Sequence, residues 1–177
     1  MATPPTKQQV HRLLQMREAG LVSWKHLQPW AAKQIAALET PPAWLCELLS
    51  LTFAGDIDRC LREVLIAPPF EPFDQAMLSD YSVSCLMVRY ERRELAWRTV
   101  LQQSGELVDN MNCGAESCEF YFDLLNELED SECDPAVEER QVRAVRQLLT
   151  ASIALVIADF EPFERAFREG VATRRSP

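Results

Sequence analysis

Residues 56–65, with the sequence DIDRCLREVL, show the pattern that decides the fold. The apolar side chains recur at spacings of three and four, which places them on one face of a helix. They are Ile57, Cys60, Leu61, Val64 and Leu65. Helical spacing of this kind recurs along most of the chain, whereas the alternation typical of strands is scarce. We therefore predict an all-α protein.

Toward the N-terminus, glycine, serine and proline mark where helices begin and end. A first helix is expected after Pro4-Pro5 and ends at Gly20, a residue that favours helix C-termini. Ser23 is suited to cap the next helix, over 23–39, in which Pro29 marks a start or a bend. Residues 40–42 then begin a further helix with four inward residues, Trp44, Leu45, Leu48 and Leu49.

Toward the C-terminus, the pattern predicts a short helix over 70–78, with Pro72 in its first turn, and a long helix over 82–103. Residues 110–117 are expected to form a loop, with Ser117 capping a helix over 118–130. Asp134-Pro135 begins the last long helix. Its second half lies in the apolar run 148–160, LLTASIALVIADF, and is apolar on nearly every side, which predicts a central buried helix.

A closing helix is expected from Glu161-Pro162 to near Gly170. The whole pattern predicts one domain over 1–177, a bundle of about eight helices with short frayed ends at about 1–4 and 171–177. Residues 70–77, FEPFDQAM, resemble residues 160–167, FEPFERAF. Duplication of a helical half and two independent proline-initiated helices, each with a buried phenylalanine pair, both remain open.

The net charge of −9 belongs to one segment of the chain. Residues 99–139 contain 12 acidic residues and no lysine or arginine, whereas the remainder has 15 acidic and 18 basic residues. The acidic balance argues against nucleic acid as a partner, because such binding requires lysine and arginine to neutralise phosphates.

The acidic residues from position 116 to 134 form the candidate binding surface. Spacings of three and four on the helix over 118–130 place Glu119, Asp123, Glu127 and Asp130 on one face. The interpretations are a solvated surface or a docking surface for a basic partner. The residues expected to bind such a partner are Glu116, Glu119, Asp123, Glu127, Asp130, Glu132 and Asp134.

No segment indicates export or a membrane. The N-terminus lacks the apolar core of a signal peptide, and the apolar run 148–160 is shorter than the ~20 residues of a membrane span. We expect a cytoplasmic protein with reduced cysteines.

The sequence contains no catalytic, cofactor or metal motif that we recognise, so we predict a protein without enzymatic activity, cofactor or metal. Its two histidines are His11 and His26, and we expect His26 to be a packing residue beside Trp24 and Trp30. The cysteines at 46, 60 and 85 fall on apolar faces and are expected to be buried. Cys113, Cys118 and Cys133 lie among acidic residues, where free thiols, a Cys113–Cys118 disulfide and a metal site all remain open.

A resemblance adds to this interpretation. Residues 21–35, LVSWKHLQPWAAKQI, followed by residues 41–48, PPAWLCEL, resemble a pattern found in small bacterial all-helical proteins that are similar to immunity proteins of toxin systems. The likeness covers about the first 65 residues and names no catalytic residue. It implies a non-catalytic protein that neutralises a basic toxin. The alternatives are a cysteine-based redox-responsive protein and a helical scaffold subunit that associates through Trp24, Trp44 or the Phe70/Phe73 pair. The oligomeric state is left open.

Overall fold

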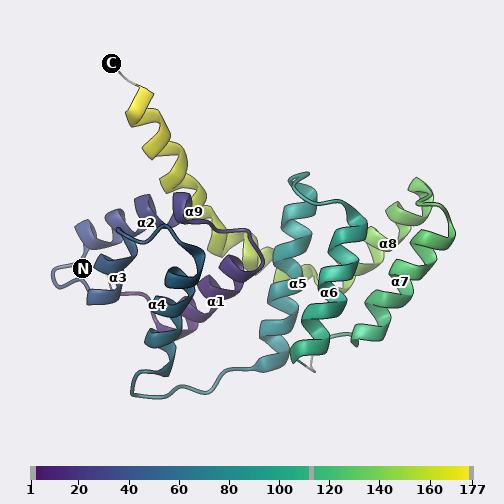
Figure 1. Cartoon of the computed structure of the whole chain (residues 1–177), viewed down its shortest axis with the longest axis horizontal. Helices are drawn as coiled ribbons and strands as arrows, with labels where there is room; N and C mark the ends of the chain where they lie inside the picture. Colours follow the sequence, from purple (N-terminus) through teal and green to yellow (C-terminus); the bar gives the residue numbers. More distant parts are fainter. Residues whose placement is uncertain (1–2, 112–113, 176–177) are drawn as a thin grey trace. The chain divides into compact units, whose positions relative to one another are not determined.

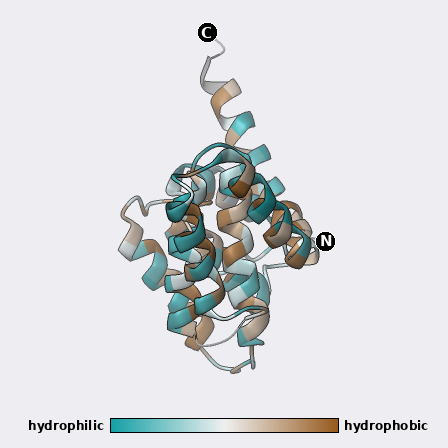
Figure 2. Ribbon diagram, turned by 90° about the vertical axis from the view of Figure 1, so that its right-hand side faces the viewer, coloured by the Kyte–Doolittle hydropathy of each residue, from teal (hydrophilic) through white to brown (hydrophobic). Residues whose placement is uncertain are grey.

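The computed structural model describes residues 3–111 and 114–175, and within these ranges the chain forms helices and no strands. This confirms the all-α fold. The helices, shown in Figure 1, are α1 (Lys7–Glu18), α2 (Trp24–Ala37), α3 (Ala43–Leu48), α4 (Ala54–Ile66), α5 (Gln75–Glu91), α6 (Trp97–Met111), α7 (Cys118–Asp130), α8 (Pro135–Leu148) and α9 (Thr150–Arg175). Hydrophobic and hydrophilic residues are interspersed along most of them (Figure 2), as amphipathic helices require.

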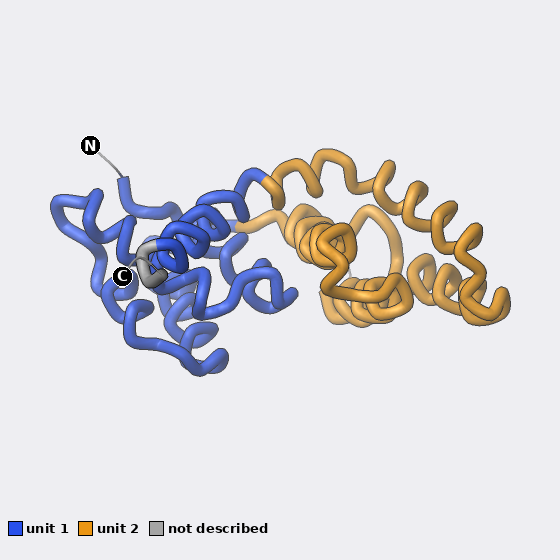
Figure 3. Tube along the Cα trace, turned by 90° about the horizontal axis from the view of Figure 1, so that it is seen from above, with its two compact units in different colours: residues 1–72, 158–177 blue, residues 73–157 orange. Residues whose placement is uncertain are grey.

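The chain divides into two compact units (Figure 3). Unit 1 contains residues 1–72 and 158–177, and unit 2 contains residues 73–157. One boundary follows Pro72, and the other falls inside α9, between Ile157 and Ala158. The prediction of a single domain over 1–177 stays a prediction.

Unit 1 begins as the sequence predicts. Thr6 and Gln9 form a capping box at the start of α1, and Ser23 and His26 form another at the start of α2. The imidazole of His26 also packs against the rings of Phe160 and Phe167, with centroids 5.7 and 5.0 Å away. His26 is therefore a packing residue, as expected. The contacts α1–α4, α2–α3 and α3–α4 complete this part of the unit.

Unit 2 is built around a helix that the sequence did not single out. Every residue of α5 from Tyr81 to Val88 is buried, including Ser82 and Ser84. These small side chains allow close packing, so α5 occupies an interior position although two of its buried residues are serines. Helices α6, α7 and α8 follow, with contacts α5–α6, α6–α7 and α7–α8.

The helices predicted over 70–78 and 82–103 are wrong in their boundaries. Residues 67–74 are not helical, and Asp74 caps α5, which begins at Gln75 and continues to Glu91. Arg93 then adopts a left-handed backbone with φ 61°, which separates α5 from α6. The apolar spacing continues across this turn, and for that reason periodicity alone joined two helices into one.

The last long helix is likewise two helices. The chain breaks at Leu149, and α9 is buried on one side only, through Ile153, Val156 and Phe160, while Ile157 is 49% exposed. The predicted burial on every side is therefore wrong. Helix α9 also continues past Gly170 to Arg175, so the end expected to fray from residue 171 is helical through 175.

The two FEPF segments differ in structure. Phe160 and Phe163 are buried within α9, with Pro162 inside the helix, whereas Phe70 is 75% exposed and Pro72 lies outside any helix. The expectation of a buried phenylalanine pair at the start of a helix is wrong for the first copy. In the second copy the pair is buried, but the closing helix expected to begin at Glu161 does not begin there, because α9 is continuous from Thr150.

No single helix in the described part of the chain is both long and apolar enough to cross a membrane. Helices α8 and α9 meet the length and composition requirements only as a pair, and that pair is bent by 81°.

Candidate partner-binding face

The predicted acidic residues lie in unit 2, on α7 and on the two turns that flank it. We use the name acidic face for the seven residues Glu116, Glu119, Asp123, Glu127, Asp130, Glu132 and Asp134. Glu116 is half-buried and precedes α7, whereas the other six are exposed. From Glu119 to Asp130 the helix rises about 17 Å, at ~1.5 Å per residue.

The start of α7 is held by hydrogen bonds. The Ser117 hydroxyl accepts from the backbone N–H of Phe120 at 3.4 Å, and Asp80 of α5 accepts from the N–H of Ala115 at 2.7 Å. Ser117 is the cap that the sequence predicts. The second hydrogen bond fixes the segment before α7 to α5, so Glu116 has a defined position.

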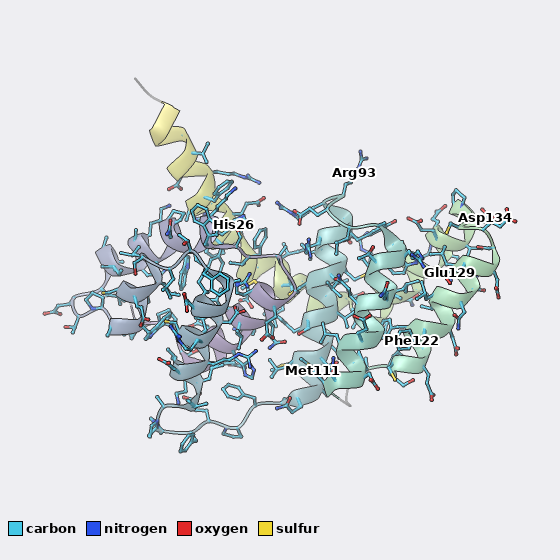
Figure 4. The ribbon with its side chains drawn as sticks, viewed as in Figure 1. His26, Arg93, Met111, Phe122, Glu129 and Asp134 are labelled. Carbon is cyan, nitrogen blue, oxygen red and sulfur yellow. The ribbon has the colours of Figure 1, made fainter. Side chains whose placement is uncertain are left out.

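Close packing places α7 on α6. A Cβ atom at Gly105 of α6 would lie only 2.7 Å from Cζ of Phe122, so a glycine is needed for the ring to sit there. Figure 4 shows Phe122 on α7. The other side of α7 is left exposed, and this is the side that carries Glu119, Asp123 and Asp130.

A buried amide connects α6, α7 and α8. Gln141 of α8 is 1% exposed, and its Oε1 accepts from the indole N–H of Trp97 at 2.9 Å. Its Nε2 donates to the carbonyl of Leu124 at 2.9 Å and to Glu127 Oε2 at 2.8 Å. Gln141 therefore satisfies its polar atoms inside the unit and fixes one acidic residue of the face.

Two acidic residues of α7 pair with arginines from other helices. Glu127 Oε1 lies 2.7 Å from Arg140 Nη2, and Glu129 Oε1 lies 2.6 Å from Arg98 Nη2. The hydrogen bond from Gln141, then that from Arg140, lowers the pKa of Glu127. The charge of Glu127 is consequently balanced within the unit. Sequence reasoning missed these pairs because they join residues 13 and 31 positions apart in the chain.

The turn after α7 carries two further acidic residues. Glu132 and Cys133 both have left-handed backbones, with φ 54° and 62°. Asp134 caps α8, and its carboxylate accepts a hydrogen bond from the backbone N–H of Ala136 at 2.9 Å. Figure 4 shows Asp134 near the C-terminal end of α7. Asp134 therefore has a structural role, whereas the side chain of Glu132 is exposed.

Within the residues that the structure describes, Glu127 is the one member of the acidic face that forms an ion pair. Of the other six, Glu116 is half-buried and Asp134 caps α8, which leaves four exposed residues without an ion pair or a capping role: Glu119, Asp123, Asp130 and Glu132. Arg93, a base at the end of α5, extends outward from that end in Figure 4. The structure thus separates the predicted set into residues that are paired or structural and exposed residues whose charge no described residue balances.

The cysteine prediction is partly wrong. Cys60 and Cys85 are buried, but Cys46 is exposed because it lies on the outer side of the short helix α3. Burial, with Glu47 and Glu63 nearby, raises the pKa of Cys60 to about 11. Cys118 is half-buried with Sγ 3.7 Å from Asp109 Oδ1, and Cys133 is exposed. Cys113 lies outside the described residues. In the described part of the chain, no three side chains gather as a metal site.

The acidic face can attract a basic surface, but it offers no nucleophile paired with a base. Its carboxylates line one exposed side of a helix that is fixed by α5, α6 and α8. This arrangement is suited to recognition of basic side chains. No protein-family model, curated protein or solved structure matches this chain.

Proposed function

We propose that this protein is a non-catalytic binding protein whose acidic face engages a basic protein, in the way that an immunity protein neutralises a basic toxin. The observation that carries the proposal is the set of exposed carboxylates without an ion pair, on a helix held rigidly by its neighbours. A surface of one charge speeds encounter with an oppositely charged partner and selects against partners of like charge.

Some carboxylates of the acidic face are already paired within the protein, so we expect the others to contribute more to partner binding. Glu127 already accepts from Arg140 and Gln141, so a partner would have to compete with both. Glu119 and Asp123 have no such competitor among the described residues, and they are four positions apart on the same side of α7. We therefore assign them the largest share of the binding energy.

The experiment is capture from a lysate of the source cells with the immobilised chain. The wild type is compared with E119K/D123K, and with E39K/E71K, which makes the same charge change at exposed residues of unit 1. We expect the wild type and E39K/E71K to retain a basic protein that is released as salt is raised from about 0.1 to 1 M, where the Debye length shortens from about 10 to about 3 Å. E119K/D123K should lose it.

Circular dichroism of all three chains shows whether each variant is folded. Retention of the same proteins by folded E119K/D123K would contradict the proposal. Loss by both variants would attribute binding to net charge and would remove the assignment to the acidic face.

The scaffold alternative also has an observation in its favour. Phe70 is 75% exposed and Ile66 is 66% exposed, in and beside the segment between α4 and α5. Exposed apolar residues of this size mark interaction surfaces in many proteins. Light scattering of the purified chain tests this alternative: an oligomer that dissociates in the variant Phe70→Ser would support it, and a monomer would contradict it.

A further inference from the structure

Unit 1 contains a cavity that the binding of a basic protein does not use. It lies between α2 and the C-terminal part of α9, and its volume is about 330 Å³. Two polar residues of α2, Lys25 and Gln28, form part of the lining. The rest of the lining has no polar side chain apart from the indole N–H and comes from both helices: Trp24, Pro29 and Ala32 of α2, and Phe167, Gly170 and Val171 of α9.

Side-chain contacts beside the cavity join α2 to α9. The ring of Phe167 packs against the imidazole of His26, with the two centroids 5.0 Å apart. Lys33 of α2 forms an ion pair with Glu169 of α9. One aromatic contact and one ion pair thus connect the two walls of the cavity.

A glycine leaves the cavity open. Gly170 lies inside α9, where glycine is less favourable than alanine, and its backbone is not left-handed. A Cβ atom at this position would make one contact with the rest of the unit, 3.6 Å from Cβ of Pro29, which is an ordinary distance. At Gly105 of α6, in contrast, a Cβ atom would lie 2.7 Å from Phe122. Neither the backbone nor the packing therefore requires glycine at position 170, and its effect is the open volume beside Pro29.

Among the described residues that line the cavity, Lys25 is the one with a charge. Its Nζ lies 5.8 Å from the centroid of the Trp24 ring, which is a cation–π distance. No carboxylate in the described part of the chain pairs with it. The amide of Gln28 already donates to the carbonyl of Leu49 at 3.0 Å. The cavity therefore combines aromatic side chains with one positive charge that the unit does not neutralise by an ion pair.

We propose that this cavity binds a small aromatic carboxylate, that is, a planar aromatic ring joined to a carboxylate by a short alkyl chain. The carboxylate would bind the Lys25 ammonium, and the ring would contact Trp24 and Phe167. The size is suitable, because a cavity of about 150 Å³ holds benzene.

Both parts of this ligand contribute to its selection. A neutral ring would lack the ion pair with Lys25, and an amine would place a second positive charge beside it. A carboxylate without a ring would gain little, because a single exposed ion pair is weak in water. An aromatic ring also gains from the preferred packing geometries with other rings, which an alkyl chain does not. The proposal concerns unit 1 and does not depend on the acidic face of unit 2.

The test is calorimetric titration of the whole chain with 3-phenylpropionate and with indole-3-acetate. Each acid is compared with its amide, which has the same ring and no charge, and with octanoate, which has the charge and no ring. We expect at least one aromatic acid to bind with a Kd of about 1 mM or lower. Its amide and octanoate should bind at least about fivefold more weakly.

Two variants at one position locate the binding. Gly170→Leu fills the cavity, whereas Gly170→Ala adds only the Cβ atom that contacts Pro29. Both replace a glycine inside a helix, so both are expected to fold, and thermal unfolding establishes that they do. We expect G170L to lose at least about tenfold in affinity and G170A to bind within about twofold of the wild type. If G170L does not fold, Ala32→Leu fills the cavity from α2 instead, with the same expected loss.

A second pair of variants tests the charge. Lys25→Gln removes the charge of the lining, whereas Arg59→Gln removes one exposed positive charge from α4 of the same unit. We expect K25Q to bind the acid and its amide with equal affinity, and R59Q to retain the preference for the acid.

Five results would overturn the proposal. In the wild type they are no binding of either aromatic acid up to about 10 mM, and an amide or octanoate that binds as tightly as the acid. In the variants they are unchanged affinity in folded G170L or A32L, an equal loss in G170A and G170L, and a preference for the acid that persists in K25Q.

Discussion

The two units differ in how their charges are used. Unit 1 contains 11 acidic and 11 basic residues and is neutral, whereas unit 2 contains 16 acidic and seven basic residues and has the whole net charge of −9. The protein is therefore not uniformly acidic. The net charge of the chain equals that of unit 2, and it does not describe unit 1, which is neutral.

Ion pairs within unit 1 join its helices. Arg17 of α1 binds Asp58 of α4 through two hydrogen bonds of 3.0 and 3.3 Å, and Arg62 of α4 pairs with Glu18 of α1. In unit 2, arginines balance some carboxylates, but acidic residues outnumber them. Charged residues in unit 1 therefore pair with one another and stabilise the fold, whereas unit 2 has more carboxylates than its ion pairs use.

A substitution in the core of unit 2 is expected to reduce stability more than any other change considered below. Trp97 is buried and is the only tryptophan of that unit. Trp97→Ala should lower the free energy of unfolding by about 3–5 kcal/mol, because it leaves a cavity and removes the donor to Gln141. Urea denaturation gives the loss, and hydrogen exchange shows where protection falls. Equal loss of protection in residues 1–72 would contradict the division into two units.

A second prediction compares ion pairs of the two units. Asp58→Asn leaves the Arg17 guanidinium, 15% exposed, without its charged partner and should cost about 1–3 kcal/mol. Glu129→Gln removes a pair whose side chains are 61% and 43% exposed and should cost about 0–1 kcal/mol. Urea denaturation of both variants tests the order. A larger loss in Glu129→Gln would show that unit 2 also depends on its ion pairs for folding.

The turns after the helices give a third comparison. Gly20 follows α1 with φ 74°, whereas Arg93 occupies the corresponding left-handed position after α5 with φ 61°. Because glycine adopts this backbone without steric cost, Arg93→Gly should stabilise the protein by about 0.5–1 kcal/mol and Gly20→Arg should destabilise it by about 1 kcal/mol. Thermal melts measure both. Destabilisation by Arg93→Gly would indicate a contact of its side chain that the backbone argument omits.

The smallest expected changes are those of stability with pH. One group of each unit has a lowered pKa, and the two groups titrate in different pH ranges. Burial lowers the pKa of His11, in unit 1, below the ordinary histidine value of 6.5. Its contribution to stability is present above pH 6.5 and is lost as the pH falls, since the unfolded chain then binds the proton more readily. The pKa of Glu127, in unit 2, is lowered from its ordinary value of 4.5, so its contribution to stability is present above pH 4.5 and is lost as the pH falls below that value. His11→Gln should reduce the pH dependence of stability just below pH 6.5 in urea titrations, and Glu127→Gln should reduce it below pH 4.5. An unchanged slope in either variant would contradict the assignment.

The sequence predicts local structure well and tertiary pairing poorly. Ser23, Ser117 and Asp134 are found as helix caps because capping depends on residues two or three positions away. The turn at Arg93 and the break at Leu149 were not predicted, because neither position holds a glycine or a proline.

For the candidate site, helical spacing alone predicts that Glu119, Asp123 and Asp130 share the exposed side of α7. It does not predict that Arg140 neutralises Glu127, because that contact depends on how α8 packs on α7.

We propose that the acidic face, and not the net charge of the chain, determines the binding of a basic protein. Zero-length carbodiimide cross-linking tests it directly, since the reagent joins a carboxylate to a lysine that touches it. With the basic protein that the wild-type chain captures, mass spectrometry should find cross-links at Glu119, Asp123, Asp130 and Glu132. Cross-links concentrated at Glu39 or Glu71 of unit 1, or spread evenly over both units, would contradict the account.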